Sequence, residues 1–168
     1  MSRGSEARGV EAAAAPVDEL TAGLRNRLFF RLYQAANLLH KTGTRALEAH
    51  GVTTQQWAVL GALADPRSQG EIAVGDLAAL LMVSRQNLNG VLSRLEARGL
   101  TERVVDARDK RSRFIHLTEE GSALWIAIQP EIGAYYGDSV TGFSNSDLIA
   151  MLHYLESLRR NFVRIQAE

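Results

Sequence analysis

The chain has 168 residues, of which 46% are hydrophobic and 23% are charged, and its 19 basic and 19 acidic side chains cancel. This length and composition are those of one ordinary soluble domain that can bury a real core. The absence of cysteine excludes disulfides, thiol nucleophiles and thiol redox switches. No apolar run reaches the 18 residues of a membrane-spanning helix, so we expect a cytoplasmic protein.

The N-terminal part of the chain predicts a tail followed by one long helix. Residues 1–16 are rich in Ala, Gly, Ser and charge and lack the apolar segment of a signal peptide, which indicates a flexible tail. Residues 17–168 are expected to form a single domain that begins with a helix over about 17–50. Its main apolar stripe is Leu24, Leu28, Leu32, Ala35 and Leu39. Gly43 weakens the expectation that this helix is unbroken.

The next segments predict a helix-turn-helix. Gly51 breaks the chain, and Thr53 with Gln56 forms a capping-box pattern that starts a helix ending near Pro66. The short apolar run 72–74 is long enough to add a third strand to a small sheet. A brief helix over 76–81 then leads into Ser84. Two helices separated by three or four residues are typical of the helix-turn-helix.

Residues 84–98 predict the recognition helix. The apolar residues Leu88, Val91, Leu92 and Leu95 recur at i, i+3, i+4 and i+7, Ser84 is a good N-cap, and Gly99 can end the helix in a left-handed turn. The opposite face carries small residues and side-chain amides where a solvated face would carry Glu and Lys. This face comprises Gln86, Asn87, Asn89, Gly90, Ser93, Arg94 and Ala97. Amide groups on a closely approaching helix suit the base edges of the DNA major groove.

A charged hairpin follows the recognition helix. Residues 101–105 and 113–117 predict two strands around a polar loop, 106–112, with three cations at its tip. Residues 84–113 contain eight Lys or Arg and four Asp or Glu, so the neutral chain concentrates positive charge here. The alternatives are a plain solvated helix with an arbitrary hairpin, or a winged-helix protein-interaction module that does not bind DNA. The cationic tip favours DNA, since interaction modules usually lack it.

The C-terminal third predicts helices with an interface. Thr118 is expected to start a helix that kinks at Pro130 and closes near Tyr136, before a turn over 137–142. A second start signal lies at residues 144–147, and the clearest apolar periodicity of the chain follows it. This terminal seam consists of Leu148, Met151, Leu155, Leu158, Phe162 and Ile165. A monomer would bury the seam against its own first helix, but we favour a homodimer, because a reading head of this size needs two half-sites.

Several stretches together carry a family resemblance. They are Val83-Ser84-Arg85-Gln86, residues 95–100 (LEARGL), residues 106–111 (DARDKR) and residues 117–121 (LTEEG). In this order they resemble the signatures of the MarR family over about residues 20–165. The resemblance implies a mainly α fold with a small β wing, a winged helix-turn-helix over about 53–118. It also implies dimerisation helices over about 17–50 and 119–166.

The resemblance further implies a dimeric regulator, most often a repressor, that releases a pseudo-palindromic DNA operator on binding a small molecule. We assign base readout to Gln86, Asn87 and Asn89. Arg108 and Arg111 are assigned to the minor groove. Phosphate contacts are assigned to the backbone near Ser84 and to Arg85, Arg94, Lys110 and Arg113.

The sequence specifies the effector site less well than the DNA-binding surface. An aromatic flank beside a helical core stripe is more often plain packing than a pocket, and only the resemblance favours a pocket. The assigned residues are Arg25, Phe29, Arg31, Tyr33, His40, Trp57 and Trp125. They suit an aromatic acid, or the aromatic acyl-CoA recognised by family members that control aromatic catabolism.

Catalysis finds no support in the sequence. The four histidines, at positions 40, 50, 116 and 153, are scattered, and no metal-ligand, nucleophile-elbow or phosphate-loop motif is present. We therefore expect no enzyme, no metal and no cofactor.

Overall fold

A computed structural model of the protein describes residues 19–68, 70–105 and 113–168. The chain divides into two units, residues 1–39 and residues 40–168, and the boundary falls within the first helix. The tail predicted at 1–16 lies outside the described residues. No helix within the described ranges is long and apolar enough to cross a membrane.

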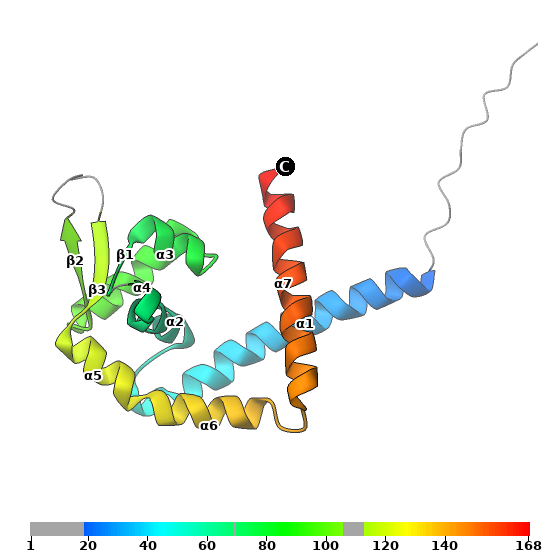
Figure 1. Cartoon of the computed structure of the whole chain (residues 1–168), viewed down its shortest axis with the longest axis horizontal. Helices are drawn as coiled ribbons and strands as arrows, with labels where there is room; N and C mark the ends of the chain where they lie inside the picture. The colour runs from blue at the N-terminus through cyan, green and yellow to red at the C-terminus, as the bar shows by residue number, and fades with distance from the viewer. Residues whose placement is uncertain (1–18, 69, 106–112) are drawn as a thin grey trace, which may run out of the picture. The chain divides into compact units, whose positions relative to one another are not determined.

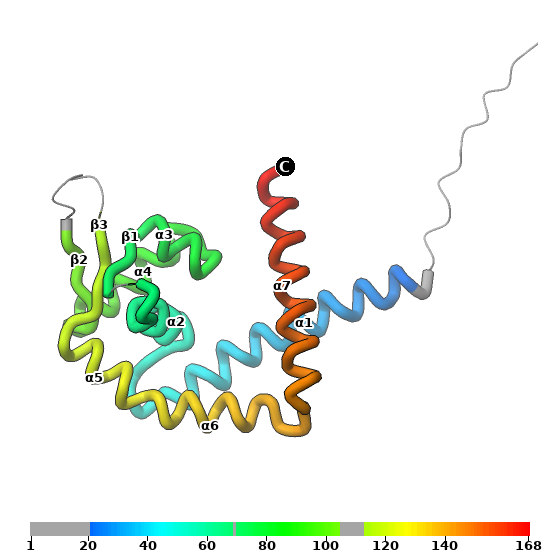
Figure 2. Tube along the Cα trace, in the orientation of Figure 1, coloured from blue at the N-terminus to red at the C-terminus, as the bar shows by residue number. Residues whose placement is uncertain are grey.

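The first helix, α1 (Glu19–Ala46), is continuous through Gly43 (Figure 2). Gly43 is buried, and a Cβ at this position would lie 2.6 Å from the Cγ2 methyl of Thr54, so the glycine permits a close contact rather than a break. The helix ends earlier than the predicted residue 50. A short 3-10 turn, η1 (Glu48–His50), follows it, and Gly51 at φ +61° reverses the chain.

A winged head, which we define as residues 54–117, contains the predicted elements in order (Figure 1). The helix α2 (Thr54–Ala64) and the turn η2 (Pro66–Ser68) precede β1 (Glu71–Ala73). Then come α3 (Val74–Leu80), α4 (Arg85–Ala97), β2 (Thr101–Val105) and β3 (Arg113–Leu117). The antiparallel sheet has the order β1-β3-β2, which confirms the third strand, whereas α3 begins two residues before the predicted start at Asp76.

The core of the winged head is built from the apolar faces that the periodicity predicts. Leu88, Leu92 and Leu95 of α4 are at most 1% exposed. They belong to one buried cluster with Leu60 of α2 and Ile115 of β3. Burying a Leu side chain stabilises a fold by about 1.5–3 kcal/mol, so this face fixes α4 against the sheet and α2.

The helix caps match the sequence signals closely. Oγ1 of Thr53 accepts from the backbone N–H of Gln56, and the Gln56 side chain accepts from the backbone N–H of Thr53, which completes the capping box. Thr118 caps α5 (Glu119–Ala127) by accepting from the N–H of Gly121 at 3.0 Å, and its hydroxyl donates to the carbonyl of Gly99 at 2.6 Å. Gly121 is buried against the backbone carbonyl of Leu100.

The last part of the chain differs from prediction in two details. The kink expected at Pro130 lies two residues earlier, at Ile128, which separates α5, ending at Ala127, from α6 (Gln129–Ser139); the proline lies in the first turn of α6. The expected helix end near Tyr136 is wrong, since α6 continues through Gly137, whose cost of about 1 kcal/mol in a helix is tolerable. Gly142 at φ +89° makes the turn. The final helix α7 (Asn145–Ala167) starts with the predicted cap, a capping box between Ser144 and Asp147.

Candidate nucleic-acid interface and effector cavity

The outward face of α4 is exposed as its composition predicts. Gln86, Asn89 and Arg94 are all exposed, while the four apolar residues behind them are buried. Oγ of Ser84 accepts from the N–H of Asn87 at 3.1 Å and so caps the helix. The N-terminal end of α4 therefore presents amide side chains on a rigid, well-capped helix, which suits close approach to base edges and phosphates.

The turn between α3 and α4 is held by backbone hydrogen bonds. The N–H of Val83 donates to the carbonyl of Ala78 at 3.1 Å, and Met82 adopts the left-handed conformation with φ 54°. The guanidinium of Arg85 lies about 3.0 Å from where a Cβ on Gly75 would be. A glycine at the start of α3 thus leaves room for Arg85 beside both helices of the motif.

The wing is attached to α4 by an ion pair. Nε of Arg103 on β2 donates to Oε1 of Glu96 on α4 at 2.5 Å, and both side chains are about three-quarters buried. Across the hairpin, Nε2 of His116 lies 2.6 Å from Oε1 of Glu102, its partner in the strand register. Arg113 is exposed at the start of β3, whereas the predicted wing-tip contacts Arg108, Lys110 and Arg111 lie outside the described residues.

Charge counting overstated the positive face, because two of its cations have internal partners. Arg103 is paired with Glu96. Arg98 donates to the backbone carbonyls of Gly51 and His50, at 2.6 and 2.9 Å. No sequence signal pointed to the second contact, since its partners lie 47 and 48 residues away along the chain.

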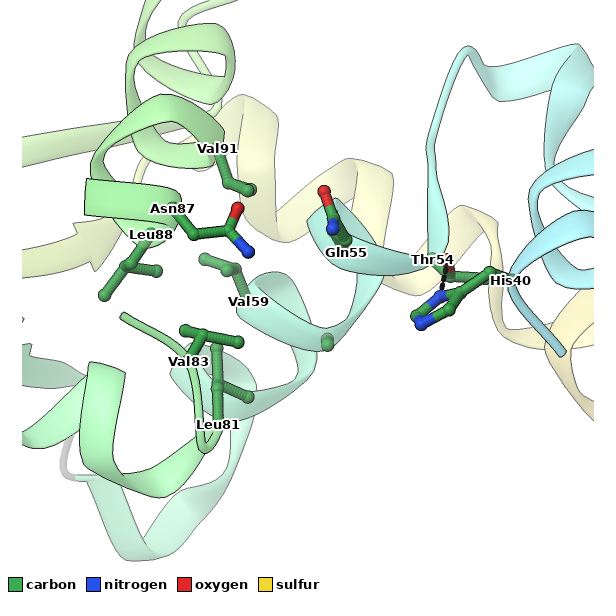
Figure 3. Close-up of a pocket in the computed structure, with 10 residues that line it drawn as sticks. His40, Thr54, Gln55, Val59, Leu81, Val83, Asn87, Leu88 and Val91 are labelled. Carbon is green, nitrogen blue, oxygen red and sulfur yellow. Dashed lines mark hydrogen bonds between the residues drawn. The ribbon is translucent and has the colours of Figure 1, made fainter. Parts of the chain in front are cut away.

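A cavity of about 320 Å³ lies behind the recognition helix (Figure 3). Its walls are mainly apolar, and a few polar groups converge on it. Nδ1 of His40 lies 2.9 Å from Oγ1 of Thr54, while Asn87 extends from α4 toward the space bordered by Gln55 of α2. The lining residues are His40, Thr54, Gln55, Ala58, Val59, Leu81, Val83, Asn87, Leu88 and Val91.

The residues predicted for the effector site have different surroundings in the structure. His40 lines the cavity, but Trp57 packs on Tyr136 with ring centroids 5.4 Å apart, and Trp125 covers Gly61. Both indoles also pack against the core cluster. The other four, Arg25, Phe29, Arg31 and Tyr33, are exposed on the part of α1 that belongs to the first unit.

Sequence reasoning missed three polar lining residues, because cavities form between distant segments. Thr54 and Gln55 lie inside the capping-box pattern that the sequence shows between Thr53 and Gln56, and Asn87 carries a prediction of base readout alone. Asn87 is exposed on the first turn of α4 and also lines the cavity. No spacing rule along a single helix reveals this second contact.

Comparison with known proteins assigns the fold. The model of the MarR family matches residues 50–112. The chain is 54% identical over 143 residues to the transcriptional activatory protein BadR of Rhodopseudomonas palustris, a match covering 84% of this chain and 82% of the relative. This chain belongs to the MarR family. It is accordingly a winged helix-turn-helix, DNA-binding transcriptional regulator and not an enzyme.

Two further proteins to which the chain is similar are informative. The homoprotocatechuate degradative operon repressor of Escherichia coli is 30% identical, and the match covers 79% of this chain and 88% of the repressor. The structure of Bordetella bronchiseptica BpsR, whose DNA binding is regulated by 6-hydroxynicotinic acid, is 25% identical with a TM-score of 0.68. That match covers 80% of this chain and 91% of BpsR.

Proposed function

We propose that this regulator binds a pseudo-palindromic operator as a homodimer and is released by a small aromatic carboxylic acid. The observation that carries the proposal is the cavity behind α4, because one of its walls is the inner face of the recognition helix itself. A ligand bound there contacts the element that reads DNA. Release by a ligand is the behaviour of a repressor, and the homoprotocatechuate relative is named as one.

The DNA half of the proposal predicts different effects for two exposed residues of α4. Gln86→Ala is expected to cost about 1–3 kcal/mol of operator binding and to relax preference at one base pair, since an amide reads a base edge. Arg94→Ala should weaken binding to every sequence and lower the salt slope by about 0.9, as expected for one lost phosphate contact. Fluorescence anisotropy measures both on a duplex selected by the protein from a random library.

The selected duplex should contain an inverted repeat with half-site centres roughly 34–36 Å apart, or a multiple of that. Ser157→Ala on α7 is the control, because α7 lies outside the winged head. Absence of any salt-sensitive binding by the wild type would overturn the assignment of α4. Equal losses on specific and random DNA for Gln86→Ala would remove its role in readout.

The chemistry of the cavity favours an aromatic carboxylate. Ligand cavities usually exceed about 300 Å³, so this one accommodates a single substituted ring. Val59, Leu81 and Val83 offer it an apolar wall. The imidazole of His40 can donate to a carboxylate, and the amides of Gln55 and Asn87 can bind ring hydroxyls. The acid named for BpsR has this combination of an aromatic ring, a carboxyl group and a hydroxyl group.

Replacing His40 should separate ligand response from DNA binding. Benzoate, homoprotocatechuate and benzoyl-CoA are titrated into the operator complex, and a true effector should weaken wild-type binding about 5- to 150-fold. His40→Ala should lose most of that response and keep operator affinity within a few fold, because His40 is on α1 and not on the winged head. His153→Ala, on α7, is the control.

The same titration separates the two ligand classes and the two signs of regulation. A response to benzoyl-CoA alone would assign the thioester in place of the free acid. A transcription assay with the responding compound distinguishes the repressor that we propose from an activator, the function in the name of the relative BadR. A His40→Ala variant that responds like the wild type would place the effector elsewhere.

A further inference from the structure

Arg98 joins the end of the recognition helix to a distant connection. It is the C-cap residue of α4, and its Nη1 and Nη2 donate to the carbonyls of Gly51 and His50, at 2.6 and 2.9 Å. Those two carbonyls end the short turn η1, and Gly51 is left-handed. Carbonyls at a helix C-terminus need external donors, and a planar guanidinium can bind two of them at once.

The contact continues beyond the connection to α6. Nε2 of His50 lies 3.2 Å from Oε1 of Glu131, and this hydrogen bond holds the pKa of the Glu131 carboxyl below its usual range. Three segments that are far apart in the sequence thus meet around His50. They are the end of α4, the connection between α1 and α2, and the first turn of α6.

The cavity touches the other end of the same helix. Asn87, Leu88 and Val91, in the N-terminal half of α4, line it, while Arg98 lies one residue past the last turn. A helix that is held at one end and displaced near the other tilts about the held end. Twelve residues separate Gln86 from Arg98, which gives a lever of roughly 18 Å at about 1.5 Å per residue.

We infer that Arg98 is a positioning residue, the pivot about which ligand in the cavity tilts α4, and that it does not contact DNA. Without the pivot, displacement at Asn87 moves α4 as a whole, and the helix tilts less than it does in the wild type. The inference deepens the proposed function, on which its ligand arm rests. It assigns release to a tilt of the recognition helix within one subunit, a motion separate from any change in the spacing of two subunits.

The test compares Arg98 with Arg94, a cation one turn earlier on the exposed face. Operator affinity is measured by anisotropy over a range of salt, with and without benzoate, homoprotocatechuate and benzoyl-CoA. Arg98→Ala should leave the salt slope unchanged and reduce the ligand-induced loss of affinity to less than a third of its wild-type factor. Arg94→Ala should lower the salt slope by about 0.9 and keep the wild-type ligand factor, by which we mean the fold-change in operator affinity that the ligand causes. Arg98→Lys should show an intermediate ligand-induced loss of affinity, because a single ammonium replaces a guanidinium that donates from two nitrogen atoms.

Glu131→Gln tests the path to α6. It should also reduce the ligand factor, and the double variant with Arg98→Ala should be no worse than the stronger single variant, because residues acting through one network are not additive. Independent structural damage at two sites would add. If Arg98→Ala does not fold, the same comparison of single and double variants is made with Arg98→Lys and Glu131→Gln.

Each failure has its own signature. A wild type that binds no operator refutes the proposed function. A salt slope lowered by about one in Arg98→Ala shows a phosphate contact and overturns the pivot, as does an unchanged ligand factor. If none of the three probes acts on the wild type, hydrogen exchange decides. The pivot requires faster exchange at residues 47–52 and 95–100 in Arg98→Ala than in Arg94→Ala, and equal exchange overturns it.

Discussion

Leu155→Asp is expected to convert the protein into a monomer that no longer binds its operator. The terminal seam remains largely unburied within a single chain, where Leu155 is 45% and Ile165 61% exposed. A dimer interface would bury this stripe, and an unpaired carboxylate there costs several kcal/mol unless water reaches it. A single reading head then has only one half-site to bind. Sedimentation and anisotropy measure the two losses together.

His153→Asp is the matched control, because it places the same charge on the opposite side of α7. It should leave the mass in solution and the operator affinity close to wild type. A wild type that sediments as a monomer contradicts the proposal at once. A dimeric Leu155→Asp variant with full affinity would show that the seam is not the interface.

Gly121→Ala is expected to destabilise the fold more than the same change at any other glycine in the described ranges. A Cβ at this position would overlap the backbone carbonyl of Leu100, which cannot rotate away as a side chain would. Relief requires α5 to move off the wing and to break the hydrogen bond from Thr118 to the carbonyl of Gly99. We expect a loss of at least about 3 kcal/mol, the upper part of the overpacking range, in urea unfolding.

Gly133→Ala provides the comparison, because it makes the same change within α6 where nothing lies within 4 Å of the added carbon. There the alanine should stabilise the protein by about 0.5–1 kcal/mol through better helix propensity. A Gly121→Ala variant as stable as the wild type would mean that α5 and the wing are not packed as described.

Local signals in the sequence predicted the fold well. Ser84, Thr118 and the Thr53–Gln56 box start helices through bonds to residues three positions away, so their patterns are visible in a short window. The buried face of α4 follows equally from 3.6-residue periodicity. The sequence places Gly137 in a turn and counts Gly43 against an unbroken helix, because propensity alone does not reveal that the surrounding packing tolerates a glycine.

Non-local contacts account for what the sequence did not reveal. The cavity joins residues 40, 54–59 and 81–91, and no periodicity records that convergence. Arg98 looked like one more cation of a basic face, but its acceptors are backbone carbonyls, which any residue carries. The exposed face of α4 was predictable because it lies on a single helix. A cavity built by several segments was not.

The proposed function gives Asn87 two roles, and together they would constrain how this regulator can change over time. The residue lies on the first turn of the recognition helix and also lines the cavity. Under that function we expect a substitution there to alter operator preference and effector preference together, so that a duplicated copy could not adopt a new inducer through this position without losing its old promoters. Gln55 and Ala58 line the same cavity from α2 and lie off the recognition helix. We therefore expect diversification of the inducer, by natural drift or in the construction of a biosensor, to be less restricted at positions 55 and 58 than at position 87.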